Sequence, residues 1–313
     1  MQNIRWQLVP VLGSDLVLLP LPGKDLGVVY EARAAGHEWV VKLEHRTRHS
    51  MAKIHGLLAR HSEIPAPRVH TCVDAGCSAW RIVVMEKCPG TPAHQLLATV
   101  GSGEQGRLLD VLVETLRRLQ GIRFDVYGLF DENGSVFRSF GSRLEHLRAK
   151  EAHALARHEV RLRADGVVSQ IFRSAAAAMV QLEAVPEQDA VLVHGDFKLT
   201  NVIVESISPP RLSIVDWEWA RAYEAAFDCC SFLIKYHDAE HLCRGFWGRY
   251  LRETRIDPLL VACYLPIECF LHVDWALSQD RKPNLHVLRF ARMLPNVDKV
   301  KSWLRGLSAE VSP

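Results

Sequence analysis

The chain has 313 residues, of which 48% are hydrophobic and 24% are charged, a composition typical of a globular protein. Its formal net charge of +2 at pH 7 gives no indication of nucleic acid or an anionic membrane surface as the main partner. The 8 cysteines include no Cys-x-x-Cys pair, which excludes zinc-ribbon and thioredoxin-like motifs. The sequence has no signal-peptide pattern, so we expect reduced thiols and a cytoplasmic protein.

The first part of the chain is expected to be rich in strands. Residues 4–12 and 15–21 have β-type character, and their apolar run is too short and too interrupted to cross a membrane. Gly23 and Gly27 follow in a turn, and a glycine-containing hairpin can place backbone N–H groups over phosphates. The next apolar strand ends at Lys42.

Apolar periodicity predicts a mainly helical remainder. Hydrophobic positions recur at intervals of three and four residues, which is typical of amphipathic helices. The most apolar of these segments contains Glu268 and Asp274, so we expect a core helix there and not a membrane span. The predicted helices cover residues 50–61, 106–119, 142–164, 167–182 and 259–277, and a buried strand is predicted at 81–85.

The most informative stretch runs from residue 191 to residue 220. It holds three short apolar runs of β type, at 191–193, 202–204 and 212–215. Polar side chains at the ends of short buried strands are costly to desolvate unless a ligand, a metal or a network satisfies them. The pattern therefore indicates a site. Its polar positions are His194, Gly195, Asp196, Lys198, Asn201, Asp216 and Glu218.

This set of residue types fits phosphoryl transfer. That reaction needs a carboxylate to orient the attacking hydroxyl and accept its proton, oxygen ligands for Mg²⁺, and a cation near the moving phosphate. Asp196 can serve as the base and Lys198 as the cation, while Asn201 and Asp216 can bind the metal. The spacing His-x-Asp-x-Lys-x-x-Asn is that of the protein-kinase catalytic loop, and residues 194–201 match it position by position.

Two motifs together resemble the aminoglycoside phosphotransferase and choline-kinase-like family, whose members are small-molecule kinases with a protein-kinase-like fold. The first motif is His-Gly-Asp at 194–196, and the second is Asp-Trp-Glu at 216–218. The resemblance extends over nearly the whole chain, with specific motifs at Lys42, at these two positions and at Asp228. An activation segment of the kind found in protein kinases is not visible after residue 218, which disfavours a protein substrate.

The resemblance implies an α+β, two-lobed protein-kinase-like fold. A small β-rich lobe at residues 1–88 would bind the nucleotide, and a larger, mainly helical lobe at 89–313 would carry the catalytic loop and the substrate site. The hinge is expected near residues 86–90. His194 and Asp228 would support the catalytic loop structurally, Asp228 by accepting hydrogen bonds from the loop backbone.

The resemblance also implies how a nucleotide is held. Gly23, Gly27 and Lys42 would fix the triphosphate, with the lysine on the α- and β-phosphates. The backbone of the hinge, at Glu86 and Cys88, would bind the purine edge.

The chain departs from the fold's usual pattern at the helix after Lys42. In this fold a glutamate on that helix pairs with the lysine, but the predicted helix at 50–61 contains no acidic residue. Glu44 or Glu63 could substitute, or Asp216 could hold Lys42 directly. This departure leaves a nucleotide-binding pseudokinase open as an alternative to an active kinase.

The function implied by the resemblance is transfer of the γ-phosphate of ATP or GTP, with Mg²⁺, to a hydroxyl of a small molecule. An antibiotic of the aminoglycoside or nucleoside/peptide type is the leading acceptor, for resistance or self-protection; the alternative within enzymes is a metabolic kinase for choline, homoserine or a sugar. Expected partners are the nucleotide and the acceptor, with no nucleic acid or membrane, in a monomer or homodimer. The residues predicted to face the acceptor are Glu218, Glu268, His272 and Trp275; the last three share one helical face.

Overall fold

The computed structural model describes residues 2–21, 29–45, 51–74, 80–131 and 133–308. Its contacts group the chain into two compact units, each built from several segments. Unit 1 comprises Met1–Thr99, Phe130–Phe137 and Leu199–Ala220. Unit 2 comprises Val100–Leu129, Arg138–Lys198 and Arg221–Pro313. The functional division into lobes at residue 88 stays a prediction.

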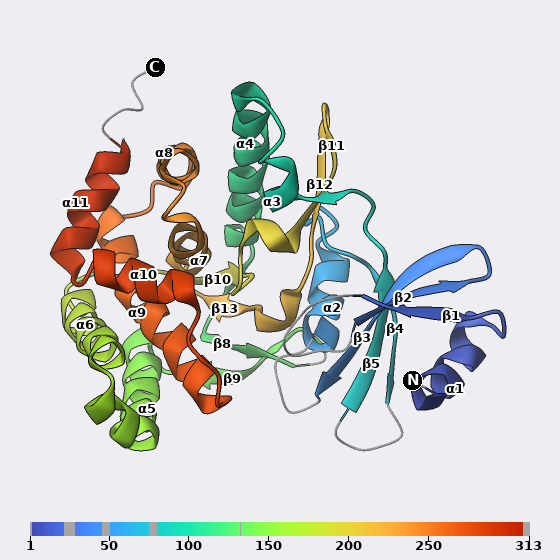
Figure 1. The fold of residues 1–313 in the computed structure, drawn as a ribbon, viewed down its shortest axis with the longest axis horizontal. Coiled ribbons are helices and arrows are strands. Elements are labelled where there is room, and N and C mark those ends of the chain that lie inside the picture. The colour runs from blue at the N-terminus through green and yellow to red at the C-terminus, as the bar shows by residue number, and fades with distance from the viewer. Residues whose placement is uncertain (1, 22–28, 46–50, 75–79, 132, 309–313) are drawn as a thin grey trace. The chain divides into compact units, whose positions relative to one another are not determined.

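The centre of unit 1 is a five-stranded antiparallel sheet with the strand order β1-β2-β3-β5-β4 (Figure 1). Its buried face is apolar and includes Ala32, Val41 and Ile82, each fully buried. The strands expected at 15–21 and 81–85 are confirmed. The strands are β1 (Val17–Pro20), β2 (Val29–Ala34), β3 (His37–His45), β4 (Val69–Asp74) and β5 (Trp80–Glu86).

The prediction of a strand at residues 4–12 was wrong, because this segment forms the helix α1 (Gln2–Leu12). Apolar residues alternate here as they do in a strand, but Trp6 is 77% exposed and contributes nothing to a buried face. The side chains that pack against the sheet are Leu8 and Leu12, which lie four residues apart and so share one face of a helix. Burial of residues that lie four positions apart therefore favours a helix in this segment.

Unit 1 also contains a short three-stranded sheet with the order β12-β11-β6. Gly90 has φ +117°, and a Cβ atom there would overlap the backbone carbonyl of Val204. Glycine therefore lets the chain approach β11 closely enough for Val204 to pair with Thr91. The elements are α2 (Met51–Arg60), β6 (Thr91–Pro92), α3 (Ala93–Leu96), β11 (Val202–Ile207) and β12 (Pro210–Ile214).

Unit 2 combines long helices with most of a second five-stranded sheet, of order β7-β10-β13-β8-β9. The helices predicted at 106–119, 142–164, 167–182 and 259–277 are confirmed, with ends that differ by a few residues at most. The strands are β7 (Arg123–Phe124), β8 (Tyr127–Phe130), β9 (Val136–Phe140), β10 (Ala190–Val193) and β13 (Arg221–Tyr223). The helices are α4 (Ser102–Gln120), α5 (Arg143–Ala164), α6 (Gly166–Leu182), α7 (Ala226–Tyr236), α8 (Glu240–Thr254), α9 (Pro258–Ser278), α10 (Leu285–Met293) and α11 (Val297–Ser308).

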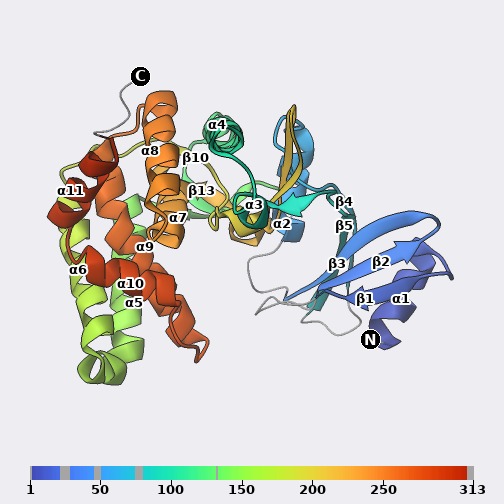
Figure 2. The ribbon, with the colours of Figure 1, turned by 45° about the horizontal axis from the view of Figure 1, so that its top comes forward.

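The helix α9 forms the core of unit 2. By length and composition it is apolar enough to cross a membrane, with a mean hydropathy of 1.4, but 72% of that apolar window is buried inside the protein. It lies between α6 and α7 and packs against both (Figures 1 and 2). The expectation of a core helix is therefore confirmed.

A buried ion pair fixes the segment that leads into α7. The Arg143 guanidinium lies 2.6 Å from Glu224, and the two side chains are only 2% and 0% exposed. Arg143 also donates to the backbone carbonyls of Leu182 and Val185, so its charge is well satisfied. A buried pair contributes little net stability, but it fixes register because any other arrangement would leave a charge unpaired. Glu224 lies directly before α7, whose first turn carries Asp228.

Candidate active site

The two predicted metal ligands lie at the same end of one hairpin in unit 1. Strands β11 and β12 pair with Val202 opposite Ile214, and the backbone N–H of Val215 donates to the carbonyl of Asn201 at 2.8 Å. Asn201 therefore directly precedes β11, and Asp216 follows the end of β12. The antiparallel register brings together two oxygen-bearing side chains that are separated in sequence by a whole hairpin.

Asp216 has an unusual backbone conformation, with φ 71° and ψ 47° in the left-handed region. An L-residue there costs roughly 1–2 kcal/mol, and aspartate is among the residue types that tolerate it best. The turn leads into the short 3₁₀ helix η2 (Trp217–Trp219), where the Trp217 indole is buried and donates to the carbonyl of Ile214 at 2.7 Å. The buried indole fixes this turn, and with it the direction of the Asp216 carboxylate.

Lys42 on β3 is held by carboxylates of the same unit. Its Nζ lies 2.8 Å from Asp216 Oδ1, 2.5 Å from Glu218 Oε2 and 3.7 Å from Glu44 Oε1. Of the substitutes considered for the missing helix glutamate, Asp216 makes the direct contact and Glu44 a longer one. Glu63 lies 3.0 Å from the His61 ring instead.

The charges around Lys42 fit a divalent cation. Burial opposes a charge on Lys42, but Asp216, Glu218 and Glu44 raise its pKa above the ordinary value, so the ammonium stays charged. Burial also raises the pKa of Glu218. Three carboxylates surround one ammonium and leave a net negative charge. Carboxylate oxygens, and the amide oxygen that Asn201 offers at the same end of the hairpin as Asp216, are ligands of the kind that Mg²⁺ prefers.

In unit 2 the loop after β10 is held by Asp228. Its carboxylate accepts the backbone N–H of His194 at 2.7 Å and that of Gly195 at 2.8 Å. Gly195 has φ +80°, which glycine adopts without strain. The backbone N–H of Asp196 donates to the His194 ring at 3.2 Å. This is the geometry that the predicted supporting roles require, and the roles themselves stay predictions.

The predicted base and its cation contact each other. Lys198 Nζ lies 2.5 Å from Asp196 Oδ2, with the two side chains 28% and 18% exposed. A second ammonium, Lys235 on α7, was not found from the sequence. Burial lowers the pKa of Lys235, and the Lys198 charge lowers it further while Asp196 acts in the opposite direction. Asp196 is therefore a carboxylate in a cationic environment.

The residues predicted to face the acceptor lie in different environments. Glu268 on α9 is 2% exposed; it accepts a hydrogen bond from Ser231 at 3.0 Å and lies 3.3 Å from His272 Nε2. Burial opposes a charge on His272, but Glu268 and then Asp196 raise its pKa. Glu218 lies in unit 1 beside Lys42. The substrate roles of these residues and of the partly exposed Trp275 stay predictions.

The structure gives less information about the other residues that are predicted to bind the nucleotide. Gly23 and Gly27 lie outside the described residues. Glu86 ends β5 at an exposed position. Burial raises the pKa of the partly buried Cys88 thiol, and a hydrogen bond with Ser213 of β12 acts in the opposite direction. The purine-binding role of the backbone at Glu86 and Cys88 stays a prediction.

The sequence matches a known protein family over most of its length. The family model described as the phosphotransferase enzyme family matches residues 20–262, more than half of the chain. The chain belongs to this family. Among curated protein sequences, none matches this phosphotransferase.

Solved structures of similar fold cover almost the whole of this phosphotransferase. A thermostable mutant of the aminoglycoside phosphotransferase APH(4)-Ia, in complex with AMP-PNP and hygromycin B, is 15% identical with a TM-score of 0.71, over 99% of this chain and 100% of that one. A putative aminoglycoside phosphotransferase from Ralstonia eutropha is 12% identical with a TM-score of 0.68, over 97% of this chain and 98% of that one. A putative fructosamine-3-kinase from Haemophilus somnus is 13% identical with a TM-score of 0.62, over 98% of this chain and 97% of that one. The predicted α+β, protein-kinase-like fold is confirmed.

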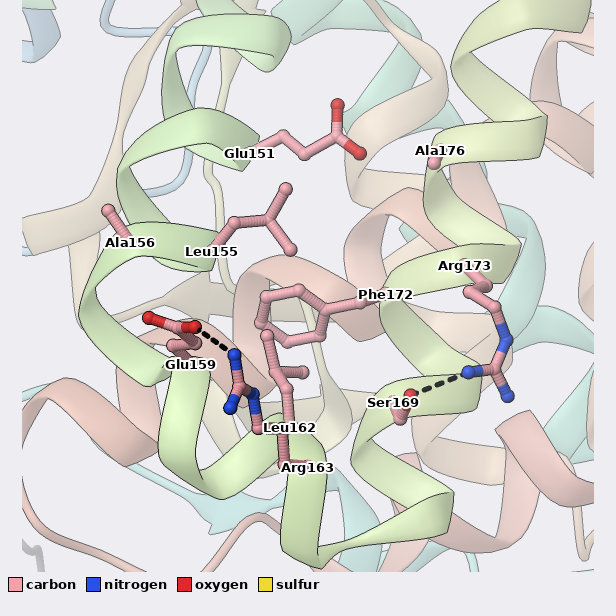
Figure 3. Close-up of a pocket in the computed structure, with 10 residues that line it drawn as sticks. All are labelled: Glu151, Leu155, Ala156, Glu159, Leu162, Arg163, Ser169, Phe172, Arg173 and Ala176. Atoms are coloured by element: carbon pink, nitrogen blue, oxygen red, sulfur yellow. Dashed lines mark hydrogen bonds and ion pairs between the residues drawn. The ribbon is translucent and has the colours of Figure 1, made fainter.

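The phosphotransferase also has a pocket of about 680 Å³ between α5 and α6. Figure 3 shows Leu155 of α5 and Phe172 of α6 pointing into it, while Arg163 pairs with Glu159 at 2.5 Å along α5. None of the predicted site residues is among its lining residues. Arg173 donates to Ser169 along α6, and the lining residues include no aspartate, asparagine or lysine of the predicted site.

The buried carboxyl of Asp228 should make the stability of this phosphotransferase depend on pH. Burial raises the pKa of Asp228 from 3.8 to about 7, against the opposing effect of the hydrogen bonds from His194 and Gly195. Between about pH 4 and pH 7 the unfolded chain has lost this proton while the folded chain keeps it, so stability falls as the pH rises. Relative to Asp228→Asn, the wild type should lose up to about 4 kcal/mol of unfolding free energy across this window.

Urea unfolding of the wild type and of Asp228→Asn at a series of pH values measures this difference. Asp189→Asn is the matched control, because the Asp189 side chain is 66% exposed. A difference between wild type and Asp228→Asn that stays constant from pH 4 to pH 7 would show that the two backbone donors keep the carboxylate ionised.

Proposed function

We propose that this protein transfers the γ-phosphoryl group of ATP or GTP to a hydroxyl of a small molecule. The observation that carries the proposal is the contact between Lys42 and Asp216, a strand lysine and a motif carboxylate that are 174 positions apart. A phosphate-binding lysine next to a metal-binding aspartate is the arrangement that kinases need. The contact also argues against a pseudokinase, because Lys42 is held even though α2 has no glutamate.

Each site residue has a separate role in the proposed phosphoryl transfer. Asp196 orients the acceptor hydroxyl and accepts its proton as the bond from oxygen to the γ-phosphorus forms. The bond from that phosphorus to the β-phosphate oxygen breaks, and the nucleoside diphosphate leaves. Lys42 binds the phosphates of the donor, and Lys198 offsets charge on the transferred group. Asn201 and Asp216 would hold Mg²⁺, which neutralises phosphate charge when bound.

For the acceptor we propose an antibiotic with little positive charge, of the nucleoside or peptide type. Lys198 contacts Asp196, and the pKa values of Lys235 and His272 respond to the Asp196 charge, which places both groups in its neighbourhood. A polycationic aminoglycoside would meet the ammonium groups of Lys198 and Lys235 there. The resulting function is resistance or self-protection in the cytoplasm, by a monomer or homodimer.

A sugar kinase is the second candidate. The fold is similar to that of a putative fructosamine-3-kinase, with a TM-score of 0.62, and a neutral polyhydroxy acceptor suits the same cationic surroundings. Choline suits them less well, because it is itself a cation.

Nucleotide consumption with a panel of acceptors tests the proposal. The full chain is incubated with Mg²⁺, with ATP or GTP, and with nucleoside and peptide antibiotics, aminoglycosides, sugars, homoserine and choline. We expect acceptor-dependent consumption, and an acceptor product heavier by one phosphoryl group in mass spectrometry. Asp196→Ala is the matched control and should give no product. Nucleotide binding without consumption for any acceptor would favour a pseudokinase.

A further inference from the structure

Two histidines and an aspartate meet where α7 ends and α10 begins. His237 caps the C-terminus of α7, Asp238 follows it, and His286 lies in the first turn of α10. Each residue offers one ligand atom, and the three atoms all lie within 4.8 Å of one another. The two helices pack against each other (Figures 1 and 2). All three residues belong to unit 2, and none has a role in the proposed phosphoryl transfer.

The His237 ring is fixed in the tautomer that a metal ligand needs. Its Nδ1 lies 2.9 Å from the backbone carbonyl of Ile234, and because a carbonyl only accepts, Nδ1 carries the proton. In the neutral ring the lone pair is therefore on Nε2, which lies 3.0 Å from Asp238 Oδ1. Phe290 packs edge-on against the ring at 5.6 Å. Metal-binding histidines commonly donate their second N–H to a backbone carbonyl in this way.

The His286 ring presents a nitrogen without a hydrogen bond. Its Nδ1 is buried and has no hydrogen-bond partner among the described residues, and it lies 4.0 Å from Asp238 Oδ2. The neutral form of an imidazole is the one that binds metal ions. An unsatisfied buried nitrogen calls for a partner.

We propose that His237, Asp238 and His286 form a binding site for a divalent transition-metal ion of the zinc class. Two imidazoles and one carboxylate suit zinc, and a tetrahedral ion at about 2.0–2.1 Å from each ligand needs ligand atoms about 3.3 Å apart. The distance of 3.0 Å from His237 Nε2 to Asp238 Oδ1 is close to that value, and the three ligand atoms all lie within 4.8 Å of one another. The exposed fractions of the Asp238 and His286 side chains, 54% and 39%, leave these two free to adjust around the fixed His237, which is 2% exposed.

The second oxygen of the aspartate already has a cationic neighbour. Arg289 lies 3.6 Å from Asp238 Oδ2, which leaves Oδ1 as the oxygen for the metal and orients the carboxylate. A bound ion would connect the C-terminus of α7 to the first turn of α10. Because the first turn of α7 carries Asp228, which holds the loop after β10, the ion would brace the helix that supports this loop.

Metal titration of the full chain tests the site. The protein is stripped with a chelator, dialysed and titrated with Zn²⁺ in the absence of nucleotide, and binding is followed by calorimetry. We expect saturation at one ion per chain, with no competition from excess Mg²⁺. Asp238→Asn and His286→Gln, at exposed and half-exposed positions, should each weaken binding at least ~10-fold. His241→Gln on α8, an exposed histidine outside the cluster, is the matched control and should bind like the wild type.

Two further readouts keep the test decisive. Co²⁺ in place of Zn²⁺ should give visible d–d bands without a thiolate charge-transfer band, whereas a thiolate band would assign the ion to cysteine and overturn the proposal. Zn²⁺ should raise the Tm of the wild type and not that of His286→Gln. Equal zinc affinity in the wild type and both cluster variants, or no saturable binding, also overturns it. None of these readouts depends on phosphoryl transfer.

Discussion

Asp196→Ala is expected to lower kcat by roughly 10²–10⁴-fold, the range typical for loss of a positioned general base. The carboxylate orients the acceptor hydroxyl and takes its proton, and the Asp228 hydrogen bonds to His194 and Gly195 hold its loop in place. Nucleotide affinity should change by no more than a few-fold, because the proposed phosphate and metal contacts come from Lys42, Asn201 and Asp216. Steady-state kinetics with the acceptor found in the panel, and nucleotide binding by calorimetry, measure the two quantities.

The control for this variant is Asp189→Ala, which removes an exposed carboxylate directly before β10 and should leave kcat unchanged. Lys198→Met adds a second comparison: it removes the cation that lies 2.5 Å from Asp196 and keeps the base. A smaller loss of kcat in Lys198→Met than in Asp196→Ala separates the two roles. If nucleotide affinity falls in parallel with kcat in Asp196→Ala, then Asp196 has a structural role and the assignment is wrong.

Local sequence patterns were sufficient for the hairpin that carries the proposed metal ligands. The apolar runs at 191–193, 202–204 and 212–215 became β10, β11 and β12, because short β-branched segments between polar turns have little alternative to pairing. The turn sets the first pair, Ile207 with Pro210, and a β-bulge between Val204 and Ser206 then shifts the register by one residue. The shifted register places Asn201 and Asp216 at one end of the hairpin.

Two features could not be predicted from the sequence: the helix at residues 4–12, whose apolar residues alternate as in a strand, and the tertiary contacts of Lys42. At residues 4–12 the apolar positions fit a strand, and only the packing of Leu8 and Leu12 against the sheet shows the helix. The partners of Lys42 are 174 and 176 positions away, and local patterns carry no information about such pairings. The sequence predicts an acceptor role for Glu218 and gives no sign of its contact with Lys42.

The metal cluster had no sequence signal either. His237 and Asp238 look like an ordinary helix end, and His286 is far away in the chain at the start of another helix. Only the packing of α10 against α7 brings the third ligand atom within reach. Zinc motifs with short spacings are visible in a sequence, but a site built from two helix ends is not.

Asp216→Asn should abolish the gain in nucleotide affinity that Mg²⁺ provides. Asparagine keeps the shape of the side chain and removes the charge of the ligand, and Lys42 remains held by Glu218 at 2.5 Å. Affinity for ATP or GTP measured in EDTA should therefore change little. In the wild type Mg²⁺ should tighten nucleotide binding. In Asp216→Asn the apparent affinity for Mg²⁺ should fall at least ~10-fold, because even the loss of a residue that hydrogen-bonds a metal ligand has an effect of this size. Calorimetry with and without Mg²⁺ measures both.

Glu218→Gln is the matched variant, because it removes the other close partner of Lys42 and leaves Asp216 in place. Its affinity in EDTA should also change little, since Asp216 still holds Lys42 at 2.8 Å, while the gain from Mg²⁺ persists. The opposite pattern, with the Mg²⁺ gain lost in Glu218→Gln and kept in Asp216→Asn, would move the metal to Glu218. Asp216 and Glu218 both contact Lys42. Comparing the two variants therefore distinguishes the carboxylate that only holds the lysine from the carboxylate that binds the metal.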